Sequence, residues 1–350
     1  MLVVISPFLF GYMFANKLAP IVCCVKKIAN FCRIWLFCVI IQTVNNINLA
    51  KMSDKNELFV LPFDHRGSFV EEMFGILGRP TEEEKERVRF FKKIIYDGFK
   101  IAIDRGAVPK TSGAILVDEE FGDEILQDAK KNGYRFCVCS EKSGQKEFEL
   151  EFGDKFAEHI DKYRPEFVKA LVRYNPDDDP DLNERQIEKL KVLSDFCIDE
   201  RYKLMVEPLV LPTEKQLEML EGDKEAYDLE MRPKLMELMM EEMQGGGVEP
   251  SVWKIEGVEE KEDYEMLVEQ ARSGGRNADI IILGRHASDE QVKRWLEVGA
   301  QVQGVTGFAV GRTIFWDALV EYKEGHIASD RASEMIASRF AYFYKIFKGK

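Results

Sequence analysis

The sequence has few of the residues on which metal centres and disulfide frameworks depend, with 7 cysteines and 4 histidines in 350 residues. Cys137, Cys139 and Cys197 stand in apolar settings without the repeated spacing of a zinc site, so we expect reduced thiols in the core. Of the four histidines, only His65 and His286 follow predicted strands. We therefore expect no metal centre built on histidine and no other cofactor.

No apolar run reaches the length of a membrane-spanning helix. Residues 2–15 and 34–41 are apolar, but each run falls short of the roughly 20 residues that a span requires. Residues 1–51 carry five basic residues, no acidic residue and four of the seven cysteines. The lysines follow the apolar stretch, whereas a secretory signal peptide has its charges first. We interpret this segment as an extension before a natural start at Met52, or as a targeting segment, and residues 52–350 as one domain.

Positive charge is scarce relative to negative charge, and the formal net charge is −13. Since five of the 49 basic residues and none of the 62 acidic residues precede Met52, the remainder has 44 basic against 62 acidic residues, a net charge of −18. This balance disfavours nucleic acid and anionic membranes as partners. With 45% hydrophobic residues the chain can bury a large core. We expect a cytoplasmic protein with a small molecule as its substrate. The sequence does not decide between a monomer and a homo-oligomer.

A glycine-rich dinucleotide-binding turn is also missing, although short apolar runs alternate regularly with segments of helical spacing. The expected strands are 58–63, 113–117, 134–139, 168–174, 204–210, 252–255, 280–283 and 307–310. The expected helices are 82–105, 124–132, 155–163, 184–200, 215–243, 261–272 and 289–298, with a C-terminal helix over 327–350 that packs on the outside. Eight consecutive strand–helix units predict an α/β fold, a single (β/α)8 TIM barrel with an extra C-terminal helix.

Lys254 lies inside the apolar run 251–256, which we interpret as a buried strand. An ammonium is costly to bury without a partner, so a lysine at this position loses its proton readily and becomes an amine nucleophile. Such an amine is typical of enzymes that form a Schiff base. Strand alternation predicts that Trp253 and Ile255 face the helices while Lys254 faces the barrel mouth. The alternative is a structural lysine that pairs with Glu256 and contributes only the packing of its aliphatic side-chain atoms.

Glu207 occupies the same position in another apolar run, 203–209, and is a candidate proton shuttle beside the amine. Its alternative role is a structural ion pair with a lysine. Lys169, on a neighbouring strand, either favours the neutral form of Lys254 by like-charge repulsion or neutralises Glu207. The sequence leaves these two roles of Lys169 open.

Polar residues follow several predicted strands, at the end of a barrel where catalytic groups gather. Asp64, His65 and Arg66 precede Gly67 and present an acceptor, an aromatic donor and a cation together at the rim. The alternative is an ordinary strand-to-helix turn with an aspartate cap. The acidic run 118–120 is weaker evidence for a site, because the dipole of a helix stabilises carboxylates in its first turn.

The segment 307–313 predicts an anion site, because loops after the seventh and eighth strands of barrels often bind phosphate through backbone N–H groups. Gly311 would free the backbone and Arg312 would add a bidentate contact. Arg285, which ends the seventh strand, would supply a second cation to the same corner. The segment 175–180, with three aspartates and two prolines, predicts a turn into a capped helix better than a metal loop.

Seven stretches together resemble the aldolase domain at the C-terminus of bacterial bifunctional 5-dehydro-2-deoxygluconokinase, the 2-deoxy-5-keto-gluconate 6-phosphate aldolases of inositol catabolism. The resemblance covers residues 52 to 323. The stretches are LPFDHRGSF, ILVDEEFG, VKALVRYNPDDD, LMVEPLV, VWKIEG, NADIIILGR and GFAVGRTIFWDAL. A more distant resemblance is to the class I tagatose-bisphosphate aldolases, and it implies Lys254 as the Schiff-base lysine, Glu207 as the proton carrier and Asp64 as the third catalytic residue. His65 stands where those enzymes have glutamine.

The resemblance implies an aldolase that cleaves a phosphorylated keto-sugar acid into dihydroxyacetone phosphate and malonate semialdehyde. Arg285, Gly311 and Arg312 would hold the phosphate, while Arg66 or Lys169 would meet a carboxylate. Two alternatives stay open: an aldolase for a ketohexose bisphosphate, and a barrel that binds sugar phosphates without catalysis. A metal-dependent aldolase is disfavoured by the scarcity of histidine.

Overall fold

The computed structural model describes residues 57–285 and 287–349. The predicted N-terminal extension, residues 1–51, and His286 lie outside the described residues. Within those two ranges, no helix combines the length and hydropathy needed to cross a membrane. Cys137, Cys139 and Cys197 are free and buried, as predicted.

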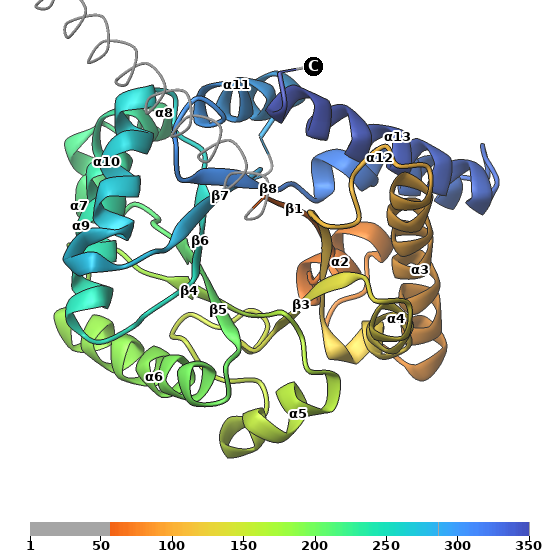
Figure 1. The fold of residues 1–350 in the computed structure, drawn as a ribbon, viewed down its shortest axis with the longest axis horizontal. Coiled ribbons are helices and arrows are strands. Elements are labelled where there is room, and N and C mark those ends of the chain that lie inside the picture. The colour runs from red at the N-terminus through yellow and green to blue at the C-terminus, as the bar shows by residue number, and fades with distance from the viewer. Residues whose placement is uncertain (1–56, 286, 350) are drawn as a thin grey trace, which may run out of the picture. The chain divides into compact units, whose positions relative to one another are not determined.

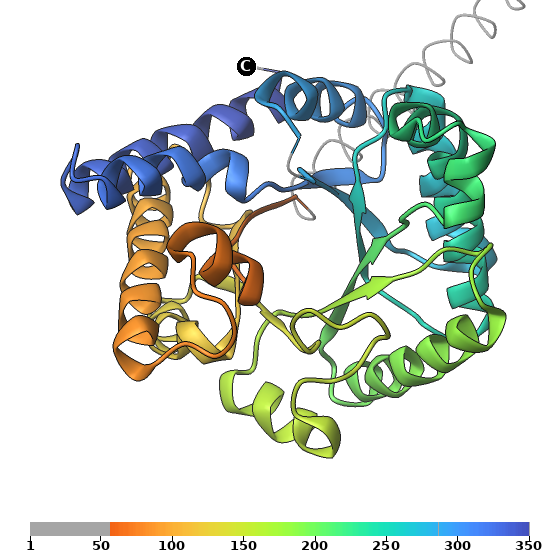
Figure 2. The same ribbon diagram turned by 180° about the vertical axis from the view of Figure 1, so that it is seen from behind.

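Eight parallel strands close into a barrel, which confirms the predicted fold. Each strand pairs with the next along the chain, and β8 returns to β1 with Phe308 opposite Phe59. Figures 1 and 2 show the strands at the centre and the helices around them from opposite sides. The strands are β1 Leu58–Pro62, β2 Gly113–Val117, β3 Arg135–Cys139, β4 Phe167–Arg173, β5 Lys203–Leu209, β6 Val252–Glu256, β7 Asp279–Leu283 and β8 Val305–Ala309.

Helices follow the strands and form the outer layer (Figure 1). Short 3-10 turns cover Gly153–Lys155 and Ser273–Gly275, and a π-helical turn covers Tyr227–Met231. The α-helices are α2 Gly67–Phe74, α3 Glu82–Asp104, α4 Glu119–Asn132, α5 Phe156–Tyr163, α6 Pro180–Asp199, α7 Glu214–Met219, α8 Lys224–Ala226, α9 Arg232–Gly245, α10 Lys261–Ala271, α11 Asp289–Gly299, α12 Arg312–Lys323 and α13 Ser329–Phe347.

The prediction of one long helix over residues 215–243 is wrong. This stretch contains α7, α8, the π-helical turn and α9. Gly222 has a φ of 84°, a left-handed conformation that ends a helix, and the side chain of Asp223 then caps α8. Gly222 is a helix-stop signal and Asp223 a helix-start signal, so the break was recognisable from these two residues although the helical spacing on either side of them concealed it.

The apolar residues of the strands divide into two sets that lie on opposite faces. The inner set fills the barrel and consists of Leu58, Val60, Ala114, Leu116, Cys137, Cys139, Phe167, Met205, Val252, Ile281 and Ala309. The outer set packs against the helices and includes Trp253 and Ile255. Because side chains alternate along a strand, Lys254 shares the inner face of β6 with Val252, as predicted.

The C-terminal helix α13 packs on the outside of the barrel against α3 and α12, as predicted. Gly98 of α3 allows this close contact, since a Cβ atom there would lie 2.7 Å from Ile336 Cγ2. The Ser333 hydroxyl donates to the Ile94 carbonyl over 3.0 Å, and Arg105 forms a bidentate ion pair with Glu334. This helix lies in the outer layer, beyond the strands that bear the candidate catalytic residues.

The loop after β4 is the predicted turn into a capped helix. The Asn175 side chain accepts the Asp177 N–H over 2.9 Å, and the Asp179 carboxylate accepts the Asp181 N–H over 3.0 Å at the start of α6. Asn175 also donates to the Gln216 side chain over 2.8 Å. The aspartates of this loop therefore shape the turn and begin the helix.

Candidate active site

Charged side chains form a layer at the carboxyl ends of the strands. Lys169, Glu207 and Lys254 lie on the same strand faces as the inner apolar set, each two residues beyond one of its members. Asp64 follows β1 and Glu141 follows β3, and both side chains are buried. The layer therefore has the apolar barrel interior on one side and the barrel mouth on the other.

Lys254 is only 4% exposed, and its Nζ lies 2.8 Å from Glu207 Oε1. The alternative of a pair with Glu256 is wrong, because Glu256 Oε1 binds Arg285 Nε at 2.6 Å. The predicted neighbours Lys254 and Glu207 are thus in direct contact, at a distance that permits proton transfer between amine and carboxylate.

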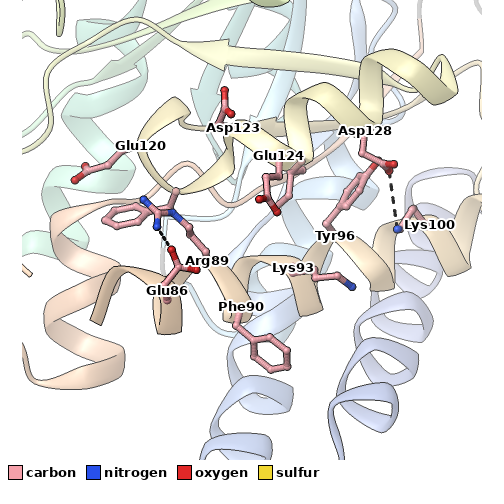
Figure 3. Close-up of a pocket in the computed structure, with 12 residues that line it drawn as sticks. Glu86, Arg89, Phe90, Lys93, Tyr96, Lys100, Glu120, Asp123, Glu124 and Asp128 are labelled. Atoms are coloured by element: carbon pink, nitrogen blue, oxygen red, sulfur yellow. Dashed lines mark hydrogen bonds and ion pairs between the residues drawn. The ribbon is translucent and has the colours of Figure 1, made fainter. Parts of the chain in front are cut away.

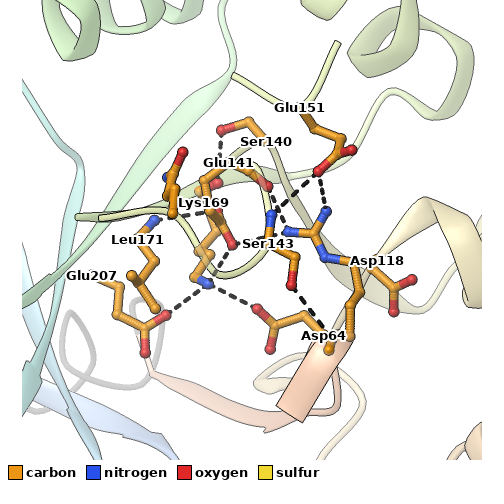
Figure 4. A network of polar contacts seen from close by, with 12 residues as sticks. Asp64, Asp118, Ser140, Glu141, Ser143, Glu151, Lys169, Leu171 and Glu207 are labelled. Carbon is orange, nitrogen blue, oxygen red and sulfur yellow. Dashed lines mark hydrogen bonds and ion pairs between the residues drawn. The ribbon is translucent and has the colours of Figure 1, made fainter. Parts of the chain in front are cut away.

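Lys169 is the centre of the layer (Figure 4). Its side chain is 1% exposed, and Nζ lies 2.8 Å from Asp64 Oδ2, 2.8 Å from Glu207 Oε2 and 2.9 Å from Glu141 Oε1. Burial alone would lower the pKa of Lys169, but the three carboxylates outweigh it and raise the pKa well above the ordinary value. Of the two roles that the sequence left open, the contact with Glu207 supports neutralisation.

The two lysines keep Asp64 and Glu207 ionised. Burial raises the pKa of each carboxyl group, but the ammonium groups of Lys169 and Lys254 outweigh burial and lower both pKa values below their ordinary range. Glu141 differs, because burial dominates the effects of Lys169 and Arg66 and raises its pKa. The site therefore places the buried Lys254 nitrogen beside a buried carboxylate that remains ionised.

A metal-type donor set lies in the same layer. One ligand atom each from Asp64, Cys139 and Glu141 lie within 4.8 Å of one another, and all three residues are buried. Lys169 Nζ binds two of these residues, so its ammonium group occupies the cation position between their carboxylates. The set contains no histidine, so the scarcity of histidine in the sequence did not reveal it.

Arg66 points from the start of α2 to the loop after β3. It donates to Glu151 Oε2 over 2.8 Å and to the Glu141 carbonyl over 2.5 Å, and it is 8% exposed. The Ser143 hydroxyl accepts the Gly67 N–H over 3.4 Å in the same region. These contacts connect the segment after β1 with the loop after β3. Glu151 was not predicted, because 85 residues separate it from Arg66.

His65 has a shielded ring nitrogen: Nδ1 is buried without a hydrogen-bond partner. Burial lowers the pKa of His65 to about 3, and the charges of Arg312 and Lys254 act in the same direction against that of Asp64. The imidazole is therefore neutral at physiological pH.

Arg285 and Arg312 bind different carboxylates, although the sequence placed them together. Arg285 follows β7 with an unusual φ of 40° and binds Asp228 as well as Glu256. Arg312, at the start of α12, binds Glu72 at 2.8 and 2.9 Å. Gly311 lies close to β1, since a Cβ atom there would be 2.4 Å from the Pro62 carbonyl oxygen.

A cavity of about 820 Å³ lies between α3 and α4 (Figure 3). Its wall includes the ion pairs Arg89–Glu86 and Lys100–Asp128 and the half-exposed ring of Phe90. Both helices belong to the outer layer, and none of the predicted site residues lines this cavity. It is separate from the charged layer.

Comparisons with known proteins support the fold. Residues 40–350 match the model of a family described as "Uncharacterized protein conserved in bacteria (DUF2090)". The structure resembles Cgl0159 from Corynebacterium glutamicum (Brevibacterium flavum), with 16% identity, a TM-score of 0.51 and coverage of 82% of this chain and 86% of that one. It also resembles the YdjI aldolase from Escherichia coli K12, with 11% identity, a TM-score of 0.50 and coverage of 85% and 94%. No curated protein sequence matches the chain. At these identities the two structures establish the barrel fold alone.

Replacing Lys169 by methionine should destabilise the protein strongly. The change leaves Asp64, Glu141 and Glu207 buried without their shared cation, and breaking a buried pair in this way costs about 3–5 kcal/mol of unfolding free energy. Urea unfolding measures the loss. The matched control is Lys203→Met, which removes an exposed pair with Glu166 and should cost about 1 kcal/mol or less. Equal losses in the two variants would contradict the central role of Lys169.

Lowering the pH should reduce the folding stability of the protein, and His65 should account for part of this loss. Because its pKa falls from 6.5 to about 3 on folding, the unfolded chain binds a proton between these values that the folded protein does not. Stability should therefore fall as the pH drops below 6.5, by up to about 1.4 kcal/mol per pH unit from this group. Urea unfolding at pH 7 and pH 5 tests this. The variant His65→Gln cannot titrate there and should lose less stability than the wild type; parallel losses would refute the assignment.

Proposed function

This chain belongs to the DUF2090 family, and from that starting point we propose that it is a class I aldolase, which forms a Schiff base between Lys254 and its substrate. The observation that carries the proposal is the direct contact of Lys254 Nζ with Glu207 Oε1 at 2.8 Å inside a barrel mouth. A primary amine shielded from water, with a carboxylate base at hydrogen-bond distance, matches the requirement for nucleophilic attack on a carbonyl.

The first step transfers a proton from the Lys254 ammonium to Glu207. The freed amine attacks the ketone carbon and forms a carbinolamine. Glu207 then returns the proton to the departing hydroxyl group, water leaves, and a protonated imine remains. The depressed pKa of Glu207 supports its role as an ionised base before substrate arrives.

Cleavage then breaks a carbon–carbon bond in the imine. A carboxylate removes the proton of the hydroxyl group beyond that bond, an aldehyde leaves, and the bonding electrons move to the iminium nitrogen to give an enamine. Protonation of the enamine carbon and hydrolysis of the imine release the second product and restore Lys254. We assign the proton transfers to Glu207 and the orientation of the hydroxyl group to Asp64.

Lys169 supports this chemistry without a covalent role. Its contacts with Asp64, Glu141 and Glu207 hold three carboxyl groups in one small volume, and its charge helps to lower the pKa of Asp64 and of Glu207. A preorganised charge arrangement of this kind needs little rearrangement during the reaction. We therefore infer that Lys169 positions the carboxylates, while Lys254 alone bonds to the substrate.

The proposed substrate is 2-deoxy-5-keto-gluconate 6-phosphate, cleaved to dihydroxyacetone phosphate and malonate semialdehyde. The seven stretches of the sequence support this choice, and so does the supply of cations around the mouth. Arg285, Gly311 and Arg312 are the proposed phosphate contacts. Because both guanidinium groups bind carboxylates, a phosphate would have to share or replace Asp228, Glu256 or Glu72.

Borohydride should trap the substrate on Lys254. Reduction converts the imine into a secondary amine, and mass spectrometry of peptides locates the added mass. We expect labelling of the wild type and of Lys203→Met, and none of Lys254→Met. Labelling of a different lysine in the wild type would overturn the assignment, and a lack of label in the presence of turnover would exclude a Schiff base.

Replacing Glu207 by glutamine should lower kcat by about 10²- to 10⁴-fold, because positioned acid–base groups contribute about that much. Glutamine keeps the size of the side chain but does not accept the lysine proton. The matched control is Glu249→Gln, a carboxylate before β6 that binds Arg276 and has no contact with Lys254 among the described residues. We expect kcat of the control within about threefold of the wild type. A similar fall in both variants would refute a special role of Glu207.

A further inference from the structure

A second cavity, of about 860 Å³, opens at the ends of β1, β2 and β3. Its wall includes Arg66 at the start of α2, Gly78 and Arg79 before α3, and Lys142 and Ser143 after β3. This volume lies in the range of small-molecule sites. Cys139 of the inner barrel set also lines the cavity, so the space extends to the charged layer.

The charges of this cavity fall into paired and unpaired groups. Arg66 binds Glu151, Lys85 binds Glu82, and Glu119 binds Lys162 and His159. In contrast, the side chains of Arg79 and Lys142 form no hydrogen bond or ion pair with any described residue, and both are exposed. The remaining acid is Glu120, whose pKa burial raises. The uncommitted charge of the wall is therefore mostly positive, which favours an anion.

The cavity and Lys254 lie on different sides of Lys169. Figure 4 shows Ser143 and Glu151 of the cavity wall on one side of Lys169, and Glu207 on the other. Glu207 in turn contacts Lys254. Lys169 therefore lies between Lys254 and the cavity. Cys139 of the cavity wall belongs to the same donor set as Asp64 and Glu141, the two residues that bind Lys169 from this side.

The ends of the proposed substrate are both anionic but differ in position. The phosphate is one carbon from the ketone, and the carboxylate is four carbons away. Arg285 follows β7, the strand next to β6, and suits the near group. The cavity at β1 to β3 suits the distant one.

We propose that this cavity binds the carboxylate of the sugar acid, with Arg79 and Lys142 as the binding cations and Arg66 as a fixed part of the wall. This inference rests on the proposed function for the identity of the substrate. Lys142 follows the third strand, in the polar run 140–142, whereas Arg79 follows no strand, so the polarity of the strand ends did not point to it.

Condensation with two aldehydes that differ only in the carboxylate tests the proposal. Dihydroxyacetone phosphate is combined with malonate semialdehyde or with the neutral 3-hydroxypropanal. In the double variant Arg79→Ala/Lys142→Ala, we expect KM for malonate semialdehyde to rise by roughly tenfold. KM for 3-hydroxypropanal and both kcat values should stay within about twofold of the wild type.

The matched control is the double variant Lys293→Ala/Arg331→Ala, which removes one lysine and one arginine from exposed positions on α11 and α13. Its KM values should not change. An unchanged KM for malonate semialdehyde in the cavity variant would overturn the proposal, as would an equal rise for both aldehydes.

A binding measurement separates this proposal from the proposed reaction. Calorimetric titration with malonate needs no turnover, and we expect its Kd to rise by roughly tenfold in the cavity variant but not in the control. Loss of malonate binding without any turnover by the wild type would refute the aldolase and retain the carboxylate site. Turnover with unaltered malonate binding and KM in the cavity variant would refute the site and retain the aldolase. Absence of malonate binding to the wild type would also refute the site.

Discussion

The buried ammonium of Lys169 is the interaction on which the candidate site depends. Three carboxyl groups, from the loops after β1 and β3 and from β5, converge within 2.9 Å of one nitrogen atom. Without that cation, Asp64 and Glu207 could not remain ionised so close together in the barrel. The same contacts hold Glu207 beside Lys254, so the positioning of the amine and its base follows from the compensation of charge.

The barrel itself explains why such a costly arrangement can form. Eight strands direct alternate side chains inward, and the lower positions are filled by apolar residues that exclude water. The charged layer at the carboxyl ends therefore has a dry, apolar interior on one side, and its own side chains are buried. The low polarity of these surroundings strengthens each ion pair. The loop after β3 closes the layer laterally through Arg66, which binds Glu151 and the Glu141 carbonyl.

The sequence predicted the elements whose signals are local. Strand bounds are correct within two residues, because each strand is a short apolar run between polar ends. Lys254 and Glu207 were recognisable because a charge inside an apolar run conflicts with its surroundings. The prediction of a single helix over 215–243 failed because helical spacing was weighted above the turn residues Gly222 and Asp223. Local patterns also missed Glu141 as a member of the site, since its importance arises only from contact with Lys169.

The sequence by itself determined the barrel, the inward direction of Lys254 and the placement of polar residues at strand ends, because strand period and apolar spacing encode them. Only the tertiary structure decided which charges pair. Lys254 binds Glu207 rather than Glu256, and Arg285 and Arg312 bind separate carboxylates. Such choices depend on the angular order of strands around the barrel and on loop conformations, which bring together residues far apart in the chain. Ionic contacts act over a few ångströms in space, and sequence distance carries little information about them.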